Sequence, residues 1–375
     1  MESIYEKKKS ENEKTVRINT CIGNDLKSTG LRVKGDRDLK EEATDTQTDD
    51  NKEDEQEVNN MRYVLENEFL KVEVSELGAT LVRFIDKKTG QDIVLGYNDD
   101  DAYLRNAFNL GASIGRNANR IENGSFMLNG KHIQLTVNDH GNQLHGGGKE
   151  GFAFRHWDLV SRSDDEVVFS YLSKDGEQGF PGNLRAQIRY RIDKNTLLWE
   201  YSGETDEDTL FNMTNHTYFN LGDETILDEY LHINTNRYAP VNEVALTLDE
   251  VRDVKDTPYD FTEFTRVGDN LSEINNIDNN FVWETMGDKL MAELKNDKLK
   301  LSVYSDLPDM HLFTASSLNT DTGKEGVPYG NYGGLALECQ FFPNGINYGD
   351  KYILPILRKG EKACHYMRYV LEGAE

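Results

Sequence analysis

Apolar and polar residues alternate along much of the chain, beginning near residue 61. Leu70, Val72 and Val74 alternate with charged or polar neighbours over residues 70–75. In residues 184–192 the even-numbered positions are apolar or aromatic, and the odd-numbered positions are Arg or Gln. A period of two places successive side chains on opposite faces of a strand, so these runs predict half-buried β-strands.

Turn-forming residues separate these runs, at residues 164–165, 174–176 and 193–195. Their spacing predicts three consecutive strands between Trp157 and Tyr201, joined as hairpins. Helical patterns are short, for example around residues 260–264. Many short strands with few helices predict an all-β protein, built as a large antiparallel sandwich or barrel.

The first 60 residues differ from the rest of the 375-residue chain. Residues 41–57 contain nine acidic residues and one lysine, and no aromatic residue follows Tyr5 in this part. Such a segment buries too little apolar surface to offset the entropy of ordering, so we expect residues 1–60 to be an acidic, disordered leader. An acidic interaction tail is the alternative, and Met61 is a second candidate for the natural start. We expect residues 61–375 to form a single domain.

Net charge and cysteine content limit the binding partners and the cellular location that we expect for this protein. The chain has 42 Lys+Arg and 67 Asp+Glu, for a formal net charge of −25. This balance argues against nucleic-acid and membrane partners, but not against a neutral sugar. No membrane-spanning apolar run or secretory signal is visible. Three cysteines are too few for a disulfide framework, so we expect a cytoplasmic protein.

Four segments are unusually rich in Gly, Asn and His. In the first, residues 111–124, Asn119 and Arg120 lie among small residues. An Arg side chain offers five donors in a fixed geometry, which suits several oxygen acceptors at once. A surface Arg in a salt bridge is the plainer alternative.

The second segment, residues 138–148, contains His140 and His145, and three glycines follow His145. Glycine allows a backbone to approach a ligand closely. The segment lacks the Gly and Ser/Thr positions of a phosphate-binding loop. The two histidines also lack the HExxH pattern or nearby Cys/His cluster of a metal site. A structural or solvent-exposed loop histidine remains the alternative.

The third segment, residues 212–221, would as a strand place Thr214, His216, Tyr218 and Asn220 on one face. This face is polar yet carries an aromatic ring. Such a mixture suits a sugar cleft, where polar groups orient the ligand and an aromatic surface covers its C–H groups. An ordinary solvated strand face is an equal alternative.

The fourth segment, residues 333–342, also alternates as a strand. Small Ala336 lies beside Glu338 on one face and leaves room for a molecule to reach the carboxylate. Cys339 lies on the opposite, apolar face, which predicts a core residue rather than a nucleophile. A solvent-facing Glu on an ordinary strand is the alternative.

Taken together, the segments resemble the aldose 1-epimerase (galactose mutarotase) family over Met61 to the C-terminus. Four blocks occur in the family's order and at similar spacing: Gly115-Arg-Asn-Ala-Asn-Arg-Ile121, Asn142-Gln-Leu-His-Gly-Gly147, Asn215-His-Thr-Tyr-Phe-Asn-Leu221 and Leu337-Glu-Cys-Gln340. The resemblance implies a β-sandwich of large sheets, called a supersandwich. It also implies exchange of the α and β anomers of free aldoses, typically galactose and glucose, without a metal or organic cofactor.

The resemblance also implies roles for single residues. Glu338 matches the general base and His216 the general acid, and ordinary pKa values of about 4.3 and 6.5 suit these roles near neutrality. The expected substrate-binding residues are Arg120, Asn119, His145, Asp278, Tyr218 and His311. Some members of the family carry Gln near the position of His311.

Three other functions are compatible with a sugar cleft. One is a carbohydrate-binding protein without catalysis, because a fold does not fix a function. Another is a glycoside hydrolase, for which Asp278 would supply a second carboxylate. The third is a sugar-phosphate epimerase, with Arg105 and Arg155 as candidate phosphate ligands. In every case we expect a small-molecule sugar partner and a monomer or homodimer.

Overall fold

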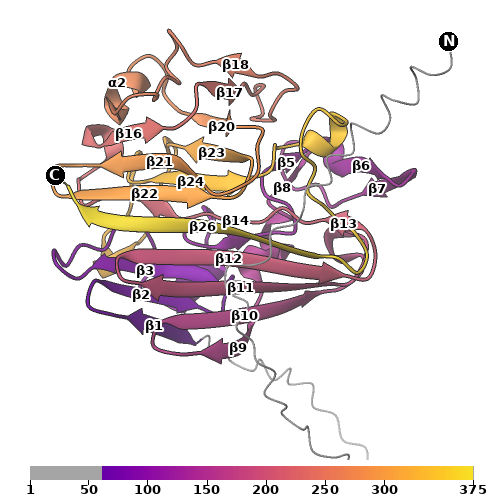
Figure 1. Cartoon of the computed structure of the whole chain (residues 1–375), viewed down its shortest axis with the longest axis horizontal. Coiled ribbons are helices and arrows are strands. Elements are labelled where there is room, and N and C mark those ends of the chain that lie inside the picture. Colours follow the sequence, from indigo (N-terminus) through magenta and orange to yellow (C-terminus); the bar gives the residue numbers. More distant parts are fainter. Residues whose placement is uncertain (1–60, 375) are drawn as a thin grey trace, which may run out of the picture. The chain divides into compact units, whose positions relative to one another are not determined.

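Strands dominate residues 61–374, which are the residues that the computed structural model describes (Figure 1). The predicted leader, residues 1–60, lies outside this part. The largest sheet is antiparallel and has nine strands, in the order β19-β16-β21-β22-β26-β12-β11-β10-β9. Their bounds are Thr265–Arg266, Tyr230–Ile233, Lys289–Lys295, Leu299–Ser305, Lys362–Gly373, Thr196–Thr205, Leu184–Asp193, Glu166–Ser173 and Asp158–Arg162.

A second sheet has six strands, in the order β15-β24-β23-β20-β17-β18. These are Tyr218–Phe219, Leu335–Gln340, Asp309–Phe313, Asp278–Val282, Arg237–Ala239 and Arg252–Asp253. A third sheet contains β1 (Arg62–Glu66), β2 (Leu70–Ser75) and β3 (Thr80–Asp86). Four small pairs complete the sheets: β13 (Thr209–Leu210) with β25 (Ile356–Leu357), β14 (Thr214–Asn215) with β4 (Ser113–Ile114), β5 (Arg120–Ile121) with β8 (Gln143–Leu144), and β6 (Ser125–Leu128) with β7 (Lys131–Gln134).

Helices are few and short. The described residues contain two α-helices, α1 (Asp100–Leu104) and α2 (Val267–Leu271). Single-turn 3-10 helices occur at Glu122–Gly124, Gly148–Glu150, Phe152–Phe154, Glu177–Gly179, Ile226–Asp228, Lys324–Gly326 and Gly345–Asn347. Within residues 61–374, no helix is both long enough and apolar enough to cross a membrane.

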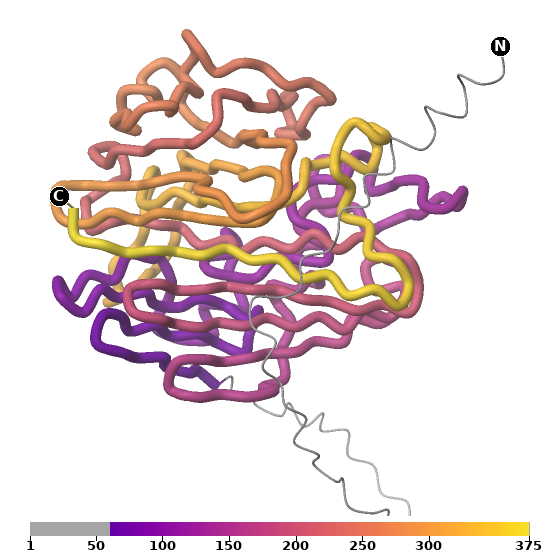
Figure 2. Tube along the Cα trace, viewed as in Figure 1, coloured from indigo at the N-terminus to yellow at the C-terminus, as the bar shows by residue number. Residues whose placement is uncertain are grey.

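The predicted all-β class and antiparallel sandwich are confirmed. One core cluster contains Ile188 and Met367 from the nine-stranded sheet, Leu312 and Leu337 from the six-stranded sheet, and Val72 from the three-stranded sheet. The sheets therefore pack face to face on a shared apolar layer. Strand β26, close to the C-terminus, lies between β12 and β22, so the end of the chain completes the large sheet (Figure 2).

Two details differ from the sequence predictions. The region around Trp157–Tyr201 contributes four strands, β9 to β12, rather than three. Residues 260–264 are not helical. There, Oδ1 of Asp260 accepts hydrogen bonds from the backbone N–H of Thr262 at 3.1 Å and from its hydroxyl at 2.6 Å. Such a side-chain turn satisfies the backbone locally and competes with a helix.

Candidate active site

The six-stranded sheet places three predicted site residues on one face. His311 on β23 pairs directly with Glu338 on β24 and with Asn280 on β20. Directly paired residues project from the same face of a sheet. Asp278 lies two positions before Asn280 on β20 and therefore shares this face. Leu312 and Leu337, on the opposite face, belong to the main core.

Strand β24 is buried on both faces, as its composition requires. Cys339 is fully buried in the main core, so its predicted structural role is confirmed. Glu338, on the other face, is only 2% exposed. Burying a carboxyl group costs free energy unless the group is hydrogen-bonded or ion-paired, and such buried groups are common at functional sites.

His216 lies between two short strands, not within one long strand. Residues 212–221 divide into β14 and β15, so the predicted continuous strand is wrong. The backbone of His216 instead bonds to a neighbouring segment: its N–H donates to the carbonyl of Ala112 at 2.8 Å, and its carbonyl accepts from Gly111 at 3.0 Å. Thr214 approaches the sulfur of Met367, and so does not share a polar face with His216.

Arg120 and His145 come together through the pairing of β5 with β8. Residues Asn119 and His145 make two mutual contacts, since the N–H of His145 donates to the Asn119 carbonyl and the N–H of Asn119 donates to Nδ1 of His145, both at 3.2 Å. Nε of Arg120 donates to Asp139 at 2.7 Å, and Nη1 donates to the carbonyl of Ala245 at 3.2 Å. Arg120 thus forms a salt bridge, as the plainer alternative in the sequence analysis expected, and it also lines the pocket described below.

Gly146, the first glycine after His145, allows a close contact between two protein backbones, whereas the sequence suggested close approach to a ligand. A Cβ on Gly146 would lie 1.9 Å from the carbonyl oxygen of Gly115, and φ at Gly146 is +73°. No side chain fits at such a distance, and the left-handed backbone also favours glycine. Gly146 therefore allows two protein backbones to meet, which holds the loop with His145 against the segment that leads to Arg120.

All eight predicted site residues line one pocket of about 160 Å³. Its size suits a small molecule rather than a polymer. Sequence reasoning missed several further lining residues: Ala107, Phe108, Asn109, Leu144 and Phe313. Phe313 follows His311 by two positions on the same strand, so both side chains project from the same face. The period of two could therefore have identified Phe313 as a pocket residue. Phe108 lies in a loop, where no periodicity marks it.

Tyr218 and Phe313 supply the aromatic part of the wall. The ring of Tyr218 lies 5.1 Å from that of His216, with an interplanar angle of 32°, and 6.1 Å from that of Phe313. Tyr218 is 1% exposed. Tyr218 therefore packs against the imidazole of His216 and exposes little of its own surface.

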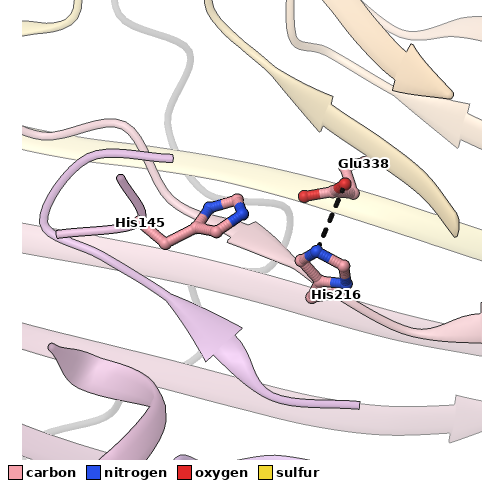
Figure 3. Close-up of side chains that lie close together, drawn as sticks. All are labelled: His145, His216 and Glu338. Atoms are coloured by element: carbon pink, nitrogen blue, oxygen red, sulfur yellow. Dashed lines mark ion pairs between the residues drawn. The ribbon is translucent and has the colours of Figure 1, made fainter. Parts of the chain in front are cut away.

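Glu338 and His216 point toward each other in the pocket wall. Nε2 of His216 lies 3.6 Å from Oε1 of Glu338, and His145 lies beside them (Figure 3). The rings of His145 and His216 meet edge to face, with centroids 5.2 Å apart. Nδ1 of His216 and Oε2 of Glu338 are buried and have no hydrogen-bond partner among residues 61–374. The pair therefore retains unused proton donors and acceptors inside the pocket.

Burial changes the proton affinities of this pair. It raises the pKa of Glu338 well above 4.5, with the negative charge of Asp278 acting in the same direction. It lowers the pKa of His216 to about 4. The order of proton affinities is therefore opposite to that of the ordinary values, and a proton shared by the two groups favours Glu338. The reason is that desolvation disfavours the charged form of each group.

His145, His216 and Glu338 also form a group of possible metal ligands, with ligand atoms within 4.8 Å of one another. His145 fits this role poorly. Its Nδ1 accepts the N–H of Asn119, so the ring proton lies on Nε2. Burial and the neighbouring His216 hold its pKa well below 6.5, which keeps the ring neutral. With one nitrogen engaged and the other protonated, His145 is a hydrogen-bond donor rather than a ligand.

The two arginines considered for phosphate binding lie outside the pocket wall. Arg155 bonds to Glu150 at 3.0 Å and to Glu177 at 2.9 Å. Arg105 follows helix α1 and is exposed. Among the described residues, Arg120 is the single basic side chain in the pocket wall that is always charged, so these residues offer a sugar phosphate no second cation there.

Comparison with known proteins agrees with this geometry. The family model described as aldose 1-epimerase matches residues 61–370. Aldose 1-epimerase of Escherichia coli (strain K12) is 35% identical over 74% of this chain and 84% of its own length. Galactose mutarotase of Bos taurus is 33% identical over 81% of this chain and 92% of its own length.

Solved structures give the same result for the fold. The crystal structure of an aldose epimerase homologue from C. elegans superposes with a TM-score of 0.79 at 27% identity, covering 84% of this chain and 100% of its own. Galactose 1-epimerase from Lactobacillus acidophilus NCFM superposes with a TM-score of 0.74 at 28% identity, covering 84% of this chain and 99% of its own. The chain belongs to the aldose 1-epimerase family and is an isomerase that interconverts the α and β anomers of aldoses.

Proposed function

We propose that Glu338 and His216 catalyse this exchange on free hexoses such as galactose and glucose. The observation that carries the proposal is the approach of Nε2 of His216 to within 3.6 Å of Oε1 of Glu338, in a pocket of monosaccharide scale. Anomers exchange when the hemiacetal ring opens and closes on the other face of C1. Opening requires one group to accept the C1 hydroxyl proton and another to donate a proton to the ring oxygen.

The pair is suited to this task because it holds one proton between an acid and a base. Before substrate binds, a proton shared by the two groups favours Glu338. Sugar hydroxyls that donate hydrogen bonds to the carboxylate favour its charged form, and the charge of Arg120 also lowers the pKa of Glu338. Substrate binding therefore moves the proton toward His216, which prepares Glu338 as base and His216 as acid.

Ring closure reverses these steps after rotation about the C1–C2 bond. Glu338 returns the proton to O1 and His216 recovers the proton from O5, so both groups end as they began. His145 donates from Nε2, and Arg120 offers its remaining N–H groups, to oxygens that become more negative as the ring opens. We propose that Asn119 and Asp278 bind sugar hydroxyls while Tyr218 supports His216.

The remaining expectations from the sequence are proposed with this function. The catalytic unit is residues 61–375. It acts in the cytoplasm without a metal or organic cofactor, as a monomer or a homodimer, with no nucleic-acid or membrane partner. Deletion of residues 1–60 should leave mutarotation intact, and loss of activity in a folded truncation would contradict this assignment.

The direct test is polarimetry on freshly dissolved α-galactose. Glu338→Gln should abolish accelerated mutarotation, and His216→Asn should lower kcat at least about a hundredfold, as expected for loss of a positioned acid. The matched control is Glu293→Gln, because Glu293 forms another Glu–His contact, to His232 at 3.2 Å, outside the pocket. The control should keep full activity.

Near-normal turnover in folded Glu338→Gln would remove Glu338 from the mechanism. A wild-type protein that binds galactose but does not accelerate mutarotation would favour the carbohydrate-binding alternative. Release of an aglycone from a chromogenic galactoside would favour the hydrolase alternative instead.

A further inference from the structure

His311 lies at the centre of the six-stranded sheet and is enclosed by other pocket residues. It is 2% exposed, on the strand between those that carry Asp278 and Glu338. Its Nε2 lies 2.6 Å from Oδ1 of Asp278, and its Nδ1 lies 3.3 Å from Nδ2 of Asn119. Both ring nitrogens therefore have protein partners, and neither is free for a sugar.

From this arrangement we infer that His311 is a positioning residue that aligns Asp278 and Asn119 around the sugar, rather than a substrate-binding or proton-transferring group. The inference rests on the proposed function of the pocket. It revises the expectation that His311 contacts the sugar directly.

The direction of each hydrogen bond can be derived from Asn119. Its Oδ1 accepts the backbone N–H of Arg120 at 2.7 Å, which identifies the other amide atom as the NH2 group. This NH2 donates to Nδ1 of His311, so Nδ1 carries no proton. The proton of the neutral ring then lies on Nε2 and is donated to Asp278. The result is one continuous chain from Arg120 through Asn119 and His311 to Asp278.

This chain of hydrogen bonds explains the low pKa of Asp278. Burial alone would raise its pKa, but the hydrogen bond from His311 and the positive charge of Arg120 act in the opposite direction, and the pKa lies below 3.8. Its side chain is 26% exposed. With Oδ1 held by His311, Asp278 is a fixed carboxylate that has Oδ2 left to accept from a sugar hydroxyl.

The same chain of hydrogen bonds also joins two parts of the pocket that are distant in sequence. Asn119 precedes β5, whereas Asp278 begins β20. His311 bridges the two, so its loss should loosen both binding residues together while Glu338 and His216 stay in place. A positioning role therefore predicts a larger effect on KM than on kcat, whereas proton transfer by His311 predicts the reverse.

Two substitutions separate these roles. Glutamine reproduces the pattern of the inferred tautomer, because its carbonyl accepts from Asn119 and its NH2 donates to Asp278. His311→Gln should therefore keep kcat and KM for galactose within about threefold of wild type. His311→Leu can make neither bond, and should raise KM about 10- to 100-fold, the range for loss of a hydrogen bond to a charged group.

The tautomer can be observed without measuring activity. In ¹⁵N-histidine-labelled protein, long-range ¹H–¹⁵N correlation spectra distinguish a protonated Nε2 from a protonated Nδ1. We expect His311, assigned by comparison with the folded His311→Gln variant, to carry its proton on Nε2 in the absence of sugar at neutral pH.

The inference is overturned if His311→Gln lowers kcat a hundredfold while the protein stays folded, since that result indicates proton transfer. It is also overturned if the proton of His311 lies on Nδ1. Failure of the proposed catalytic pair would be seen separately, as unchanged turnover in Glu338→Gln. If His311→Leu does not fold, His311→Gln and the spectrum still decide the question.

Discussion

Glu229 should make the stability of this protein fall as pH rises through neutrality. The side chain is fully buried, and Oε1 accepts the backbone N–H of Leu221 at 2.6 Å. Oε2 is buried without a hydrogen-bond partner. Burial raises the pKa of Glu229 from 4.5 to about 8, with the charge of Asp223 adding to the effect.

The size of the effect follows from the two pKa values. Between pH 4.5 and 8 the unfolded chain has lost the proton, whereas the native protein retains it. Raising the pH therefore favours the unfolded state, by about 1.4 kcal/mol for each pH unit. Over the whole interval, Glu229 removes about 5 kcal/mol of unfolding free energy. That amount is comparable to the total stability of many domains.

Urea denaturation at pH 5, 6, 7 and 8 tests this reasoning on wild type and Glu229→Gln. Glutamine still accepts from Leu221 but cannot ionise, so the difference in unfolding free energy between the proteins should change by about 4 kcal/mol over this range. Glu224→Gln, at an exposed carboxylate of the same loop, should run parallel to wild type. Parallel curves for wild type and Glu229→Gln would refute the argument.

Three further predictions concern the pocket and its supports. Asp139→Asn should raise KM for galactose about tenfold with little change in kcat, measured by initial-rate polarimetry, because Nε of Arg120 loses a charged partner at 2.7 Å. Arg116→Met should lower the unfolding free energy by about 3–5 kcal/mol in urea, because its buried guanidinium holds the hydroxyl and carbonyl of Ser173 and other carbonyls. In acid, kcat/KM should fall as the pH approaches 4, because a second proton on His216, whose pKa burial lowers to about 4, leaves the pair without a base; an acid limb centred at 6.5 would contradict that shift.

The alternation of apolar and polar residues was sufficient to predict the strands that form the sandwich. The apolar positions of residues 184–192 are buried in β11 and the intervening positions are not, as a period of two requires. Patterning failed where particular hydrogen bonds, local or between distant segments, decide the conformation. Asp260 makes a side-chain turn where a helix was expected, and residues 212–221 break at His216, where the backbone bonds to Gly111 and Ala112.

The four polar blocks contain six of the eight predicted residues that line the pocket, and Asp278 and His311 lie outside them, but the blocks do not show what each member does there. The order of proton affinities in Glu338 and His216 is opposite to that of the isolated side chains. His311, expected to touch the sugar, has both nitrogens engaged by Asn119 and Asp278. Gly146, expected to admit a ligand, meets the backbone of Gly115 instead.

By itself the sequence determined the strand-rich class and the chemical types available for catalysis, because side-chain identity and short-range periodicity are local properties. Only the tertiary structure decided the order of proton affinities in Glu338 and His216, the hydrogen-bond partners of His311 and the backbone contact of Gly146. Each of these depends on solvent exclusion or on a hydrogen-bond partner supplied by segments far apart in the chain, and no local pattern contains that information.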